Sequence, residues 1–322
     1  MDPIMLVLFA LGFVCLVKGA DFLVEGAVSI ARKFDVSDLV VGLTIVSFGT
    51  SLPEFVVNVI ASFGGNSELL IGNILGSNIS NILLIVGITA LIYKITLKRG
   101  TVYKEIPISL FAALVLILLA NDALLDSSAS SQIDRGDGFV LLAFFLLFLY
   151  YVYGITRNRE EKEIHHTSAK YPPHISVFYI LAGILGLYLG GVWVVDGAVE
   201  MATFFGISQS VIGLTIVAIG TSLPELVTSA VAAMKKNSDL AIGNIVGSNI
   251  FNIFFVLGAS AIITPVPFLF ERNLDLGVVI FASLLLFMFA AIFKPPHVIS
   301  KKEGALLFIC YVIYIAFLVI SA

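Results

Sequence analysis

Long apolar runs, separated by short charged or Gly/Pro-rich joints, dominate the hydrophobic pattern of this 322-residue chain. Most of these runs reach the length of about 20 residues that a helix needs to cross a bilayer. Their apolar positions do not alternate as those of strands do. The pattern therefore predicts an all-α integral membrane protein with ten spans, at 4–31, 39–63, 69–93, 105–121, 138–155, 175–203, 210–234, 240–263, 274–293 and 303–320.

Composition agrees with this class of protein. Hydrophobic residues make up 59% of the chain and charged residues only 12%, whereas soluble domains carry roughly 25% charged residues. The expected surroundings are therefore membrane lipid, and no feature indicates nucleic-acid binding, a cofactor or an obligate protein partner. Cys15 and Cys310 fall inside predicted spans, without a histidine or second cysteine at metal-ligand spacing, so we interpret both as core residues.

The positive charges predict an orientation. Fifteen of the 18 Lys and Arg residues lie in alternate joints, at 32–38, 94–104, 156–174, 235–239 and 294–302. Positively charged loops face the cytoplasm. We therefore predict a multi-pass protein of the plasma membrane with both termini outside.

The chain repeats itself at a shift of 171 residues. GLTIVSFGTSLPE at 42–54 matches GLTIVAIGTSLPE at 213–225 at 11 of 13 positions, and GNILGSNISN at 72–81 matches GNIVGSNIFN at 243–252 at 8 of 10. Each half holds five predicted spans, and because five is odd the halves should have opposite orientations, as in many secondary transporters. The sequence thus predicts two inverted five-helix repeats, 1–155 and 175–322, joined by a cytoplasmic linker at 156–174.

The repeated GTSLPE hexapeptide predicts a broken helix in each half. Pro53 and Pro224 lack the amide that would bond back one turn, and their rings clash with that turn. Each helix should therefore break just before Glu54 or Glu225 and leave backbone carbonyls free. Free carbonyls are tolerated at membrane depth only where protein or a polar cavity satisfies them.

The groups gathered around these breaks are all oxygen donors. Thr50, Ser51, Thr221 and Ser222 supply hydroxyls, and a second polar pair in each half, Ser77 with Asn81 and Ser248 with Asn252, has the four-residue spacing of one helix face. Hard cations such as Ca²⁺ and Na⁺ prefer oxygen ligands. A charged acid near the bilayer centre costs at least about 2.5–3.5 kcal/mol, so two facing glutamates predict a bound cation, and their charge matches one Ca²⁺.

The repeated polar segments also allow other interpretations. A single Pro-Glu pair is also compatible with a kink that carries a neutral acid, but duplication together with the hydroxyl neighbours favours an ion site. Gly72, Gly76, Gly243 and Gly247 have the spacing of close helix packing. A serine hydrolase would need a base near its serine, yet all four histidines lie in joints. A channel usually builds its filter from a ring of subunits or repeats.

Further charges lie within the spans. Lys18 and Asp21 are three residues apart and Lys18 and Glu25 seven apart, so we expect a structural ion pair on one helix face. Glu25 also corresponds to Asp196 across the repeat, which makes a role in the ion pathway the alternative interpretation.

The paired GTSLPE and GSNIxN stretches, in a five-plus-five arrangement, resemble the alpha-repeats of the cation/calcium antiporter superfamily, specifically the prokaryotic sodium/calcium exchangers. The resemblance implies a transporter and not an enzyme, which exchanges Na⁺ for Ca²⁺ by alternating access as spans 1 and 6 slide across the core. It implies a Ca²⁺ site between Glu54 and Glu225 with Thr50 and Thr221. It also implies adjacent Na⁺ sites with Ser51, Ser77, Ser222, Ser248 and the carbonyls of Ser47 and Ala218, with Asn81 and Asn252 at the same level.

The resemblance also bears on the coupling ion. Proton-coupled members of the superfamily typically show Gly-Asn-x-x-Glu where this chain has GTSLPE, and potassium-dependent members carry Asp where it has Asn252. Both differences favour Na⁺ coupling, with an H⁺- or K⁺-dependent Ca²⁺ antiporter of the same fold as the alternative. Some prokaryotic relatives also have Asp in place of Asn252. The joint at 156–174 is too short for an inserted regulatory domain.

Overall fold

The computed structural model describes residues 3–122, 131–157, 169–205, 218–293 and 296–321. In the first half of the chain, the helices are α1 (Pro3–Phe34), α2 (Asp38–Val41), η1 (Gly42–Val46), α3 (Ser47–Thr50), α4 (Leu52–Phe63), α5 (Ser67–Ile79), η2 (Ser80–Ile85), α6 (Val86–Ile92), η3 (Thr101–Glu105), α7 (Ile106–Leu119) and α9 (Arg135–Arg157). The elements labelled η are π-helical turns. Most of them continue directly into an α-helix.

The second half of the chain repeats much of this order. Its helices are α10 (Pro173–Phe204), α12 (Ala218–Thr221), α13 (Leu223–Met234), α14 (Ser238–Ile250), η6 (Phe251–Leu257), α15 (Gly258–Ile263), α16 (Arg272–Ala291) and α17 (Lys301–Ser321). Two short antiparallel ladders connect the halves. Strand β1 (Ile95–Thr96) pairs with β4 (Val298–Ile299), and β2 (Gln132–Ile133) pairs with β3 (Val266–Pro267).

Eight helices in the described part of the chain are long and apolar enough to cross a membrane, and one bent pair, Asp38–Thr50 with Leu52–Phe63, would make a ninth span. These helices correspond to nine of the predicted spans. The span predicted at 210–234 is described only from Ala218 onward. The all-α membrane class is confirmed, while the number of ten spans stays a prediction.

Side-chain caps fix where equivalent helices begin. Asn66 accepts a hydrogen bond from the backbone N–H of Leu69 (3.1 Å), and Asn237 accepts one from Leu240 (3.0 Å). Each Asn thus satisfies one of the amides that have no partner at a helix start. Helices α5 and α14 therefore begin at corresponding positions of the two halves.

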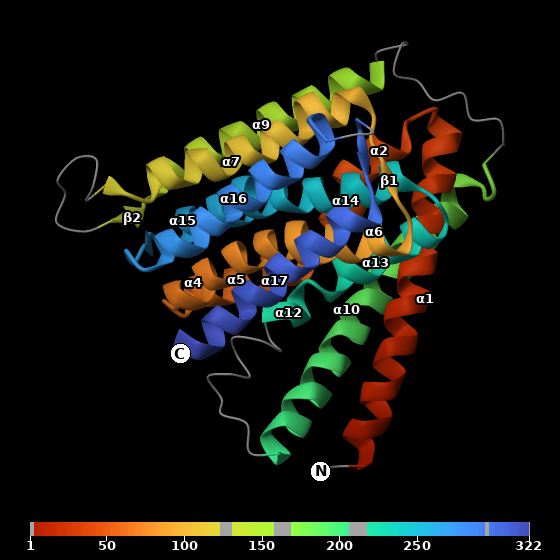
Figure 1. Ribbon diagram of the computed structural model, residues 1–322. Helices are drawn as coiled ribbons and strands as arrows, with labels where there is room; N and C mark the ends of the chain where they lie inside the picture. The colour runs from red at the N-terminus through yellow and green to blue at the C-terminus, as the bar shows by residue number, and fades with distance from the viewer. Residues whose placement is uncertain (1–2, 123–130, 158–168, 206–217, 294–295, 322) are drawn as a thin grey trace.

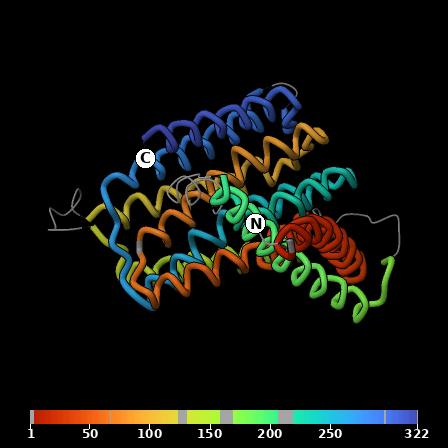
Figure 2. Tube along the Cα trace, turned by 90° about the horizontal axis from the view of Figure 1, so that it is seen from below, coloured from red at the N-terminus to blue at the C-terminus, as the bar shows by residue number. Residues whose placement is uncertain are grey.

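Helices α1 and α10 form a separate pair that crosses the other helices steeply (Figure 1). Both have 32 residues. Glycines at equivalent seven-residue spacing bring their backbones together: a Cβ on Gly19 would lie 2.9 Å from the carbonyl oxygen of Gly183, and one on Gly190 would lie 2.7 Å from that of Gly12. Figure 2 shows this pair at one side of the bundle. Only residues without a side chain allow this approach.

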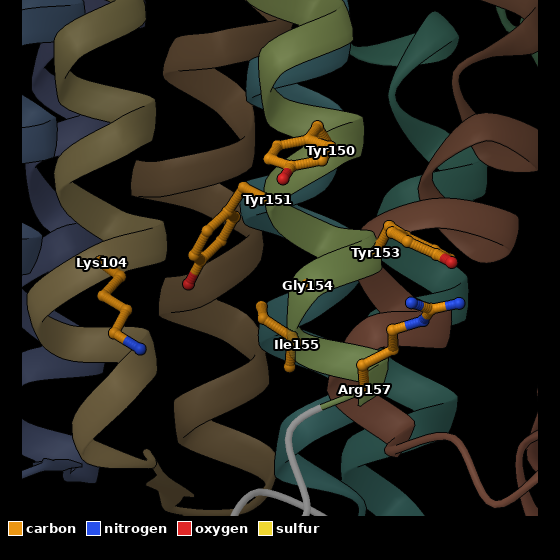
Figure 3. Close-up of a pocket in the computed structure, with 7 residues that line it drawn as sticks. All are labelled: Lys104, Tyr150, Tyr151, Tyr153, Gly154, Ile155 and Arg157. Carbon is orange, nitrogen blue, oxygen red and sulfur yellow. The ribbon is translucent and has the colours of Figure 1, made fainter.

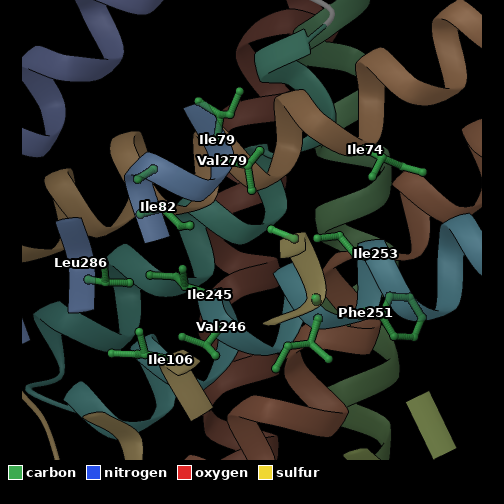
Figure 4. Packing of buried hydrophobic residues seen from close by; sticks show 14 of the residues in the cluster. Ile74, Ile79, Ile82, Ile106, Ile245, Val246, Phe251, Ile253, Val279 and Leu286 are labelled. Atoms are coloured by element: carbon green, nitrogen blue, oxygen red, sulfur yellow. The ribbon is translucent and has the colours of Figure 1, made fainter. Parts of the chain in front are cut away.

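The centre of the bundle is built around α5 and α14. In each of the spans Glu68–Ile92 and Ser238–Ile263, 83% of the apolar window is buried, against 17% for Lys301–Ser321. Ile74, Ile79 and Ile82 from the first span pack in one cluster with Ile245 and Val246 from the second (Figure 4). The two helices that carry the repeated polar motif are therefore the most enclosed helices of the molecule.

The predicted glycine packing is found on α14. A Cβ on Gly243 would lie 2.7 Å from the carbonyl oxygen of Leu39, and one on Gly247 would lie 2.9 Å from that of Leu43. Among the described residues, no atom lies within 4 Å of a Cβ at Gly72 or Gly76 on α5. At the shift of 171 residues, Leu39 and Leu43 correspond to positions 210 and 214, which the repeat predicts to contact α5. These positions lie outside the described residues.

Candidate ion-binding site

Both GTSLPE segments break their helices, and they do so at the same residue. Ser51 (φ −87°, ψ 6°) separates α3 from α4, and Ser222 (φ −87°, ψ 4°) separates α12 from α13. The first break bends the chain by 47°. Pro53 and Pro224 stand in the first turn of the following helix, where a missing amide is harmless. The breaks predicted from the prolines are therefore present.

Each break places a glutamate at the start of a helix in the interior. Glu54 and Glu225 lie in the first turns of α4 and α13 and are 1% and 0% exposed. The positive end of a helix dipole favours a carboxylate there. Ser51, three residues before Glu54, bonds the carboxylate of Glu225, so the two acids lie in one region of the interior and a positive charge between them would be stabilising.

Serine hydroxyls from other helices point at both carboxylates. Ser51 donates a hydrogen bond to Oε1 of Glu225 across the two halves (2.7 Å), and Ser248 of α14 contacts the same oxygen at 3.4 Å. Ser77 of α5 contacts Oε1 of Glu54, also at 3.4 Å. The structure thus brings these predicted residues together around two acidic centres.

The two centres are not identical. Ser222 corresponds to Ser51 in the repeat, yet its hydroxyl makes no hydrogen bond among the described residues. Glu225 therefore accepts a close hydroxyl that Glu54 lacks.

The predicted threonines contact two asparagines that sequence reasoning did not single out. Thr50 donates to Oδ1 of Asn244 (3.0 Å), and Thr221 donates to Oδ1 of Asn73 (3.1 Å). Each bond joins one half to the other. The sequence contains a signal for these asparagines, because both follow the first glycine of the duplicated GNIxGSN stretch. From that stretch and the residues after it, only Ser77, Asn81 and their counterparts were predicted as ligands.

Several buried oxygens at the site have no hydrogen-bond partner among the described residues. They are Oε2 of Glu54, Oε2 of Glu225, Oγ of Ser222, Oδ1 of Asn81 and Oδ1 of Asn252. An unsatisfied buried polar group costs free energy, and an unpaired charge costs far more. These oxygens are therefore suited to face a cation.

Asn81 and Asn252 lie where the helices change their hydrogen bonding. Each stands at the second residue of a π-helical turn, η2 or η6. π-Helical turns inside α-helices occur frequently at functional sites. Asn81 donates to Oδ1 of Asn249 (2.9 Å), so one of the two amides connects the central helices directly.

The carbonyl oxygens of Ser47 and Ala218 were also predicted as ligands, and the structure describes the contacts of the first and the position of the second. The carbonyl oxygen of Ser47 accepts the backbone N–H of Ser51 (3.0 Å) and lies 3.3 Å from the hydroxyl of Thr50. It is thus next to the break. Ala218 is the first residue of α12, two positions before the GTSLPE segment of the second half.

The expected ion pairs of Lys18 are wrong. Asp21 pairs with Lys235 (2.9 Å), and Glu25 pairs with Lys170 (2.8 Å) and Lys235 (3.5 Å). Lys235 follows α13 and Lys170 precedes α10. Tertiary packing brings these two lysines to the acids that helix spacing had paired with Lys18. Asp196 is exposed.

The donor set fits a hard cation. Among the described residues, no three His, Cys, Asp or Glu side chains come together as metal ligands. Two carboxylates surrounded by hydroxyl and amide oxygens suit Ca²⁺ and Na⁺ better than zinc or copper. A buried oxygen-lined acidic site at paired helix breaks, within an all-helical membrane protein, defines the class of cation transporter.

Comparison with known proteins identifies the family. The family model described as sodium/calcium exchanger protein matches residues 4–154 and 175–320, and the chain belongs to this family. It is therefore a cation/calcium antiporter of the Na⁺/Ca²⁺ exchanger type, a transporter family and not an enzyme family.

Similar proteins extend over nearly the whole chain. A putative antiporter, CaxA, of Alkalimonas amylolytica is 37% identical over 94% of this chain and 95% of its own length. The sodium/calcium exchanger MaX1 of Methanosarcina acetivorans is 33% identical over 96% of both. The solved structure of the sodium-calcium exchanger NCX_Mj, soaked with 2.5 mM Na⁺ and 0.1 mM Ca²⁺, is 32% identical, with a TM-score of 0.82 over 98% of this chain and 99% of that chain.

Proposed function

We propose that this protein exchanges Na⁺ for Ca²⁺ across the plasma membrane by alternating access. One observation carries the proposal: Glu54 and Glu225 are fully buried, start two broken helices, and each keep one carboxylate oxygen without a partner among the described residues. Two such oxygens with neutral donors around them offer the charge and ligand type of a Ca²⁺ site. The names of the similar proteins agree with Na⁺ and Ca²⁺ as substrates.

The ligands are proposed in two groups. Glu54 and Glu225 bind Ca²⁺ together with Thr50 and Thr221, each of which is held by an asparagine of the other half. The Na⁺ sites use the hydroxyls of Ser51, Ser77, Ser222 and Ser248 and the carbonyls of Ser47 and Ala218, with Asn81 and Asn252 at the same level. Several Na⁺ ions and one Ca²⁺ then compete for the same carboxylates, so binding one substrate displaces the other.

Access to the site is proposed to alternate through movement of α1 and α10. Ten spans form two inverted five-helix repeats, 1–155 and 175–322, with the linker 156–174 in the cytoplasm and both termini outside. The steep crossing of α1 and α10 (Figure 1) and their glycine-lined contact support a pair that moves as one body. The ion pairs from Lys235 to Asp21 and Glu25 connect that pair to the end of α13.

Transport in liposomes tests the proposal. Purified protein is reconstituted into liposomes loaded with Na⁺ and diluted into Na⁺-free medium with ⁴⁵Ca²⁺, with and without a proton ionophore. We expect Ca²⁺ uptake that requires internal Na⁺ and persists with the ionophore. Uptake that ignores Na⁺ and collapses with the ionophore would instead establish proton coupling, and uptake that requires added K⁺ would establish potassium dependence.

A further inference from the structure

Two buried asparagines contact the threonines of the ion site from the opposite half of the molecule. Asn244 of α14 is 0% exposed, and its Oδ1 accepts the hydroxyl of Thr50 (3.0 Å). Asn73 of α5 is 8% exposed and accepts the hydroxyl of Thr221 in the same way (3.1 Å). Both asparagines belong to the duplicated GNIxGSN stretch, so the two contacts are equivalent across the repeat.

The glycine before Asn244 brings α14 close to the first broken helix. A Cβ on Gly243 would lie 2.7 Å from the carbonyl oxygen of Leu39 and 3.1 Å from the Cα of Gly42. Only a residue without a side chain allows this approach. The next residue, Asn244, is thereby held within reach of Thr50.

The amide nitrogen of Asn244 fixes the orientation of its side chain. It donates to the hydroxyl of Ser229 on α13 (3.0 Å) and lies 3.5 Å from the backbone carbonyl oxygen of Glu225. A carbonyl oxygen only accepts hydrogen bonds, so the NH₂ end of the amide belongs on that side. The Oδ1 end therefore faces Thr50, and the hydroxyl of Thr50 has to donate.

The direction of this bond decides which side of the threonine hydroxyl is available to an ion. A hydroxyl has one proton and two acceptor lone pairs. The carbonyl oxygen of Ser47 lies 3.3 Å from the Thr50 hydroxyl, so Oδ1 of Asn244 is the closer acceptor for its proton. The lone pairs are then free to face a cation such as Ca²⁺, which binds through oxygen, whereas a proton turned toward the ion would be repelled.

The second half has the same arrangement with one support fewer. At the shift of 171 residues, Ser229 corresponds to Asn58, whose amide nitrogen donates to the carbonyl oxygen of Glu54 (2.9 Å). The amide nitrogen of Asn73 and Oδ1 of Asn58 have no hydrogen-bond partner in the described part of the chain. Among these residues, Asn73 therefore lacks the support that Ser229 gives to Asn244.

From these contacts we infer that Asn244 and Asn73 are positioning residues of the ion site, which take the protons of the threonine hydroxyls and so turn their lone pairs toward the bound cation. They act through Thr50 and Thr221 and need not touch the ion themselves. The inference rests on the proposed function, because it takes these two threonines as Ca²⁺ ligands.

A double-mutant cycle tests whether Asn244 acts through Thr50. Ca²⁺ binding to the purified protein in Na⁺-free buffer is measured by isothermal titration calorimetry for Thr50→Val, Asn244→Leu and the variant with both changes. Each substitution keeps the approximate size of the side chain and removes its polar atoms. We expect either single change to weaken Ca²⁺ binding by roughly tenfold. The double variant should bind Ca²⁺ as Thr50→Val does, within about twofold, because the hydroxyl that Asn244 positions is already gone.

Two control variants remove buried hydrogen bonds elsewhere in the molecule. Asn121→Leu breaks the reciprocal amide pair with Asn273 (2.9 and 2.8 Å), which also joins the two halves. Tyr151→Phe removes the hydroxyl that donates to the buried Glu105; Figure 3 shows Tyr151 on the opposite side of α9 from Tyr153. Both variants should keep the wild-type affinity for Ca²⁺, even where the unfolding temperature falls.

The equivalent cycle of Thr221→Val with Asn73→Leu tests the same statement in the other half, and it decides the question if Asn244→Leu does not fold. Three results would overturn the inference. They are wild-type affinity in the asparagine variants, a loss in the double variant that equals the product of the two single losses, and an equal loss in Asn121→Leu.

Wild-type protein tests the proposed function separately. Absence of Na⁺-dependent ⁴⁵Ca²⁺ uptake by wild-type protein in liposomes would overturn the exchange itself and the positioning role with it. Normal wild-type uptake together with any of the three results above would overturn the positioning role alone.

Discussion

At the scale of single residues, the site is defined by what each oxygen contacts. Glu225 accepts the hydroxyl of Ser51 at 2.7 Å, whereas Ser222, at the equivalent position of the other half, has no partner among the described residues. Two centres with the same sequence therefore have different surroundings. In the proposed exchanger, a difference of this kind would let the two carboxylates bind ions with different strength.

The charge of Glu225 is the first feature to test. Glu225→Gln keeps the size of the side chain and removes one of the two charges that the proposed Ca²⁺ site supplies. Truncating one partner of a buried charge pair, here the carboxylate that faces Ca²⁺, typically costs about 2–5 kcal/mol of binding free energy, so we expect Na⁺-driven ⁴⁵Ca²⁺ uptake to fall by roughly thirtyfold or more. The thermal unfolding midpoint in detergent should stay close to that of wild type.

Glu68→Gln serves as the control for this change, because Glu68 is an exposed glutamate in the first turn of α5. Its uptake should equal that of wild type. Wild-type flux in Glu225→Gln would show that the site is assigned to the wrong residues.

The hydrogen bond of Ser51 makes a second prediction. Hydrogen bonds to charged groups contribute about 1.5–3 kcal/mol, so Ser51→Ala should change the apparent Ca²⁺ affinity by roughly tenfold or more. Ser283→Ala is the matched control, since the Ser283 hydroxyl is buried and, in the described part of the chain, bonds only the carbonyl oxygen of Val279 (2.8 Å). Equal affinities for both variants would argue against a direct role of the Ser51 hydroxyl. Both are measured as Ca²⁺-dependent uptake at fixed internal Na⁺.

At the scale of elements, the helices combine three local devices at the site. Proline starts α4 and α13 directly after a break, asparagine caps fix the starts of α5 and α14, and π-helical turns follow those two helices at Ser80 and Phe251. Each device redirects side chains or backbone groups without ending the span. The polar groups thus converge inside helices that are otherwise apolar.

The contact between α1 and α10 gives the prediction at this scale. A Cβ on Gly183 would lie 2.5 Å from the backbone N of Leu23 and 2.7 Å from the carbonyl oxygen of Gly19. Gly183→Ala must therefore push the two helices apart, at a cost of about 1–3 kcal/mol. We expect a lower thermal unfolding midpoint in detergent and slower exchange.

Gly277→Ala is the control, because Gly277 is an exposed residue of α16 and no described atom lies within 4 Å of a Cβ there. Alanine also favours a helix over glycine by about 1 kcal/mol. This variant should be as stable as wild type or more so. If both variants unfold at the wild-type temperature, the close packing of α1 on α10 is not needed for stability.

At the scale of the whole molecule, contacts between the halves hold the site together. The Ser51–Glu225, Thr50–Asn244 and Thr221–Asn73 bonds all join one half to the other, and a short strand ladder ties the halves at each end. The α1–α10 pair packs on this body through a buried apolar cluster that includes Ala20, Val46 and Ala232, and through the ion pair of Asp21 with Lys235. This arrangement supports a fixed site with a movable pair of helices.

Orientation in the membrane is tested by cysteine labelling. In a background with Cys15→Ala and Cys310→Ala, Glu271→Cys before α16 and Lys301→Cys at the start of α17 introduce single exposed cysteines. We expect an impermeant maleimide to label the first in intact cells and the second only after permeabilisation. Val279→Cys, at a position that is 1% exposed, should stay unlabelled in both cases. The reverse pattern would place both termini in the cytoplasm.

The sequence by itself determined the membrane class, the repeat and the acids at its centre. Apolar runs of span length indicate burial in lipid. Proline indicates a break within its own turn, and the duplication singles out GTSLPE and GSNIxN as the candidate functional segments. For this reason a break just before each glutamate could be predicted, and the structure places the two breaks at Ser51 and Ser222, three residues before Glu54 and Glu225.

Only the tertiary structure decided which groups meet. Thr50 bonds Asn244, which lies far away in the chain. Helix spacing predicted that Asp21 pairs with Lys18, whereas in the structure Asp21 pairs with the distant Lys235. The π-helical turns at Ser80 and Phe251 likewise had no signal in the local sequence pattern. Such contacts arise when helices pack, because local sequence fixes the face that a helix presents but not the helix that it meets.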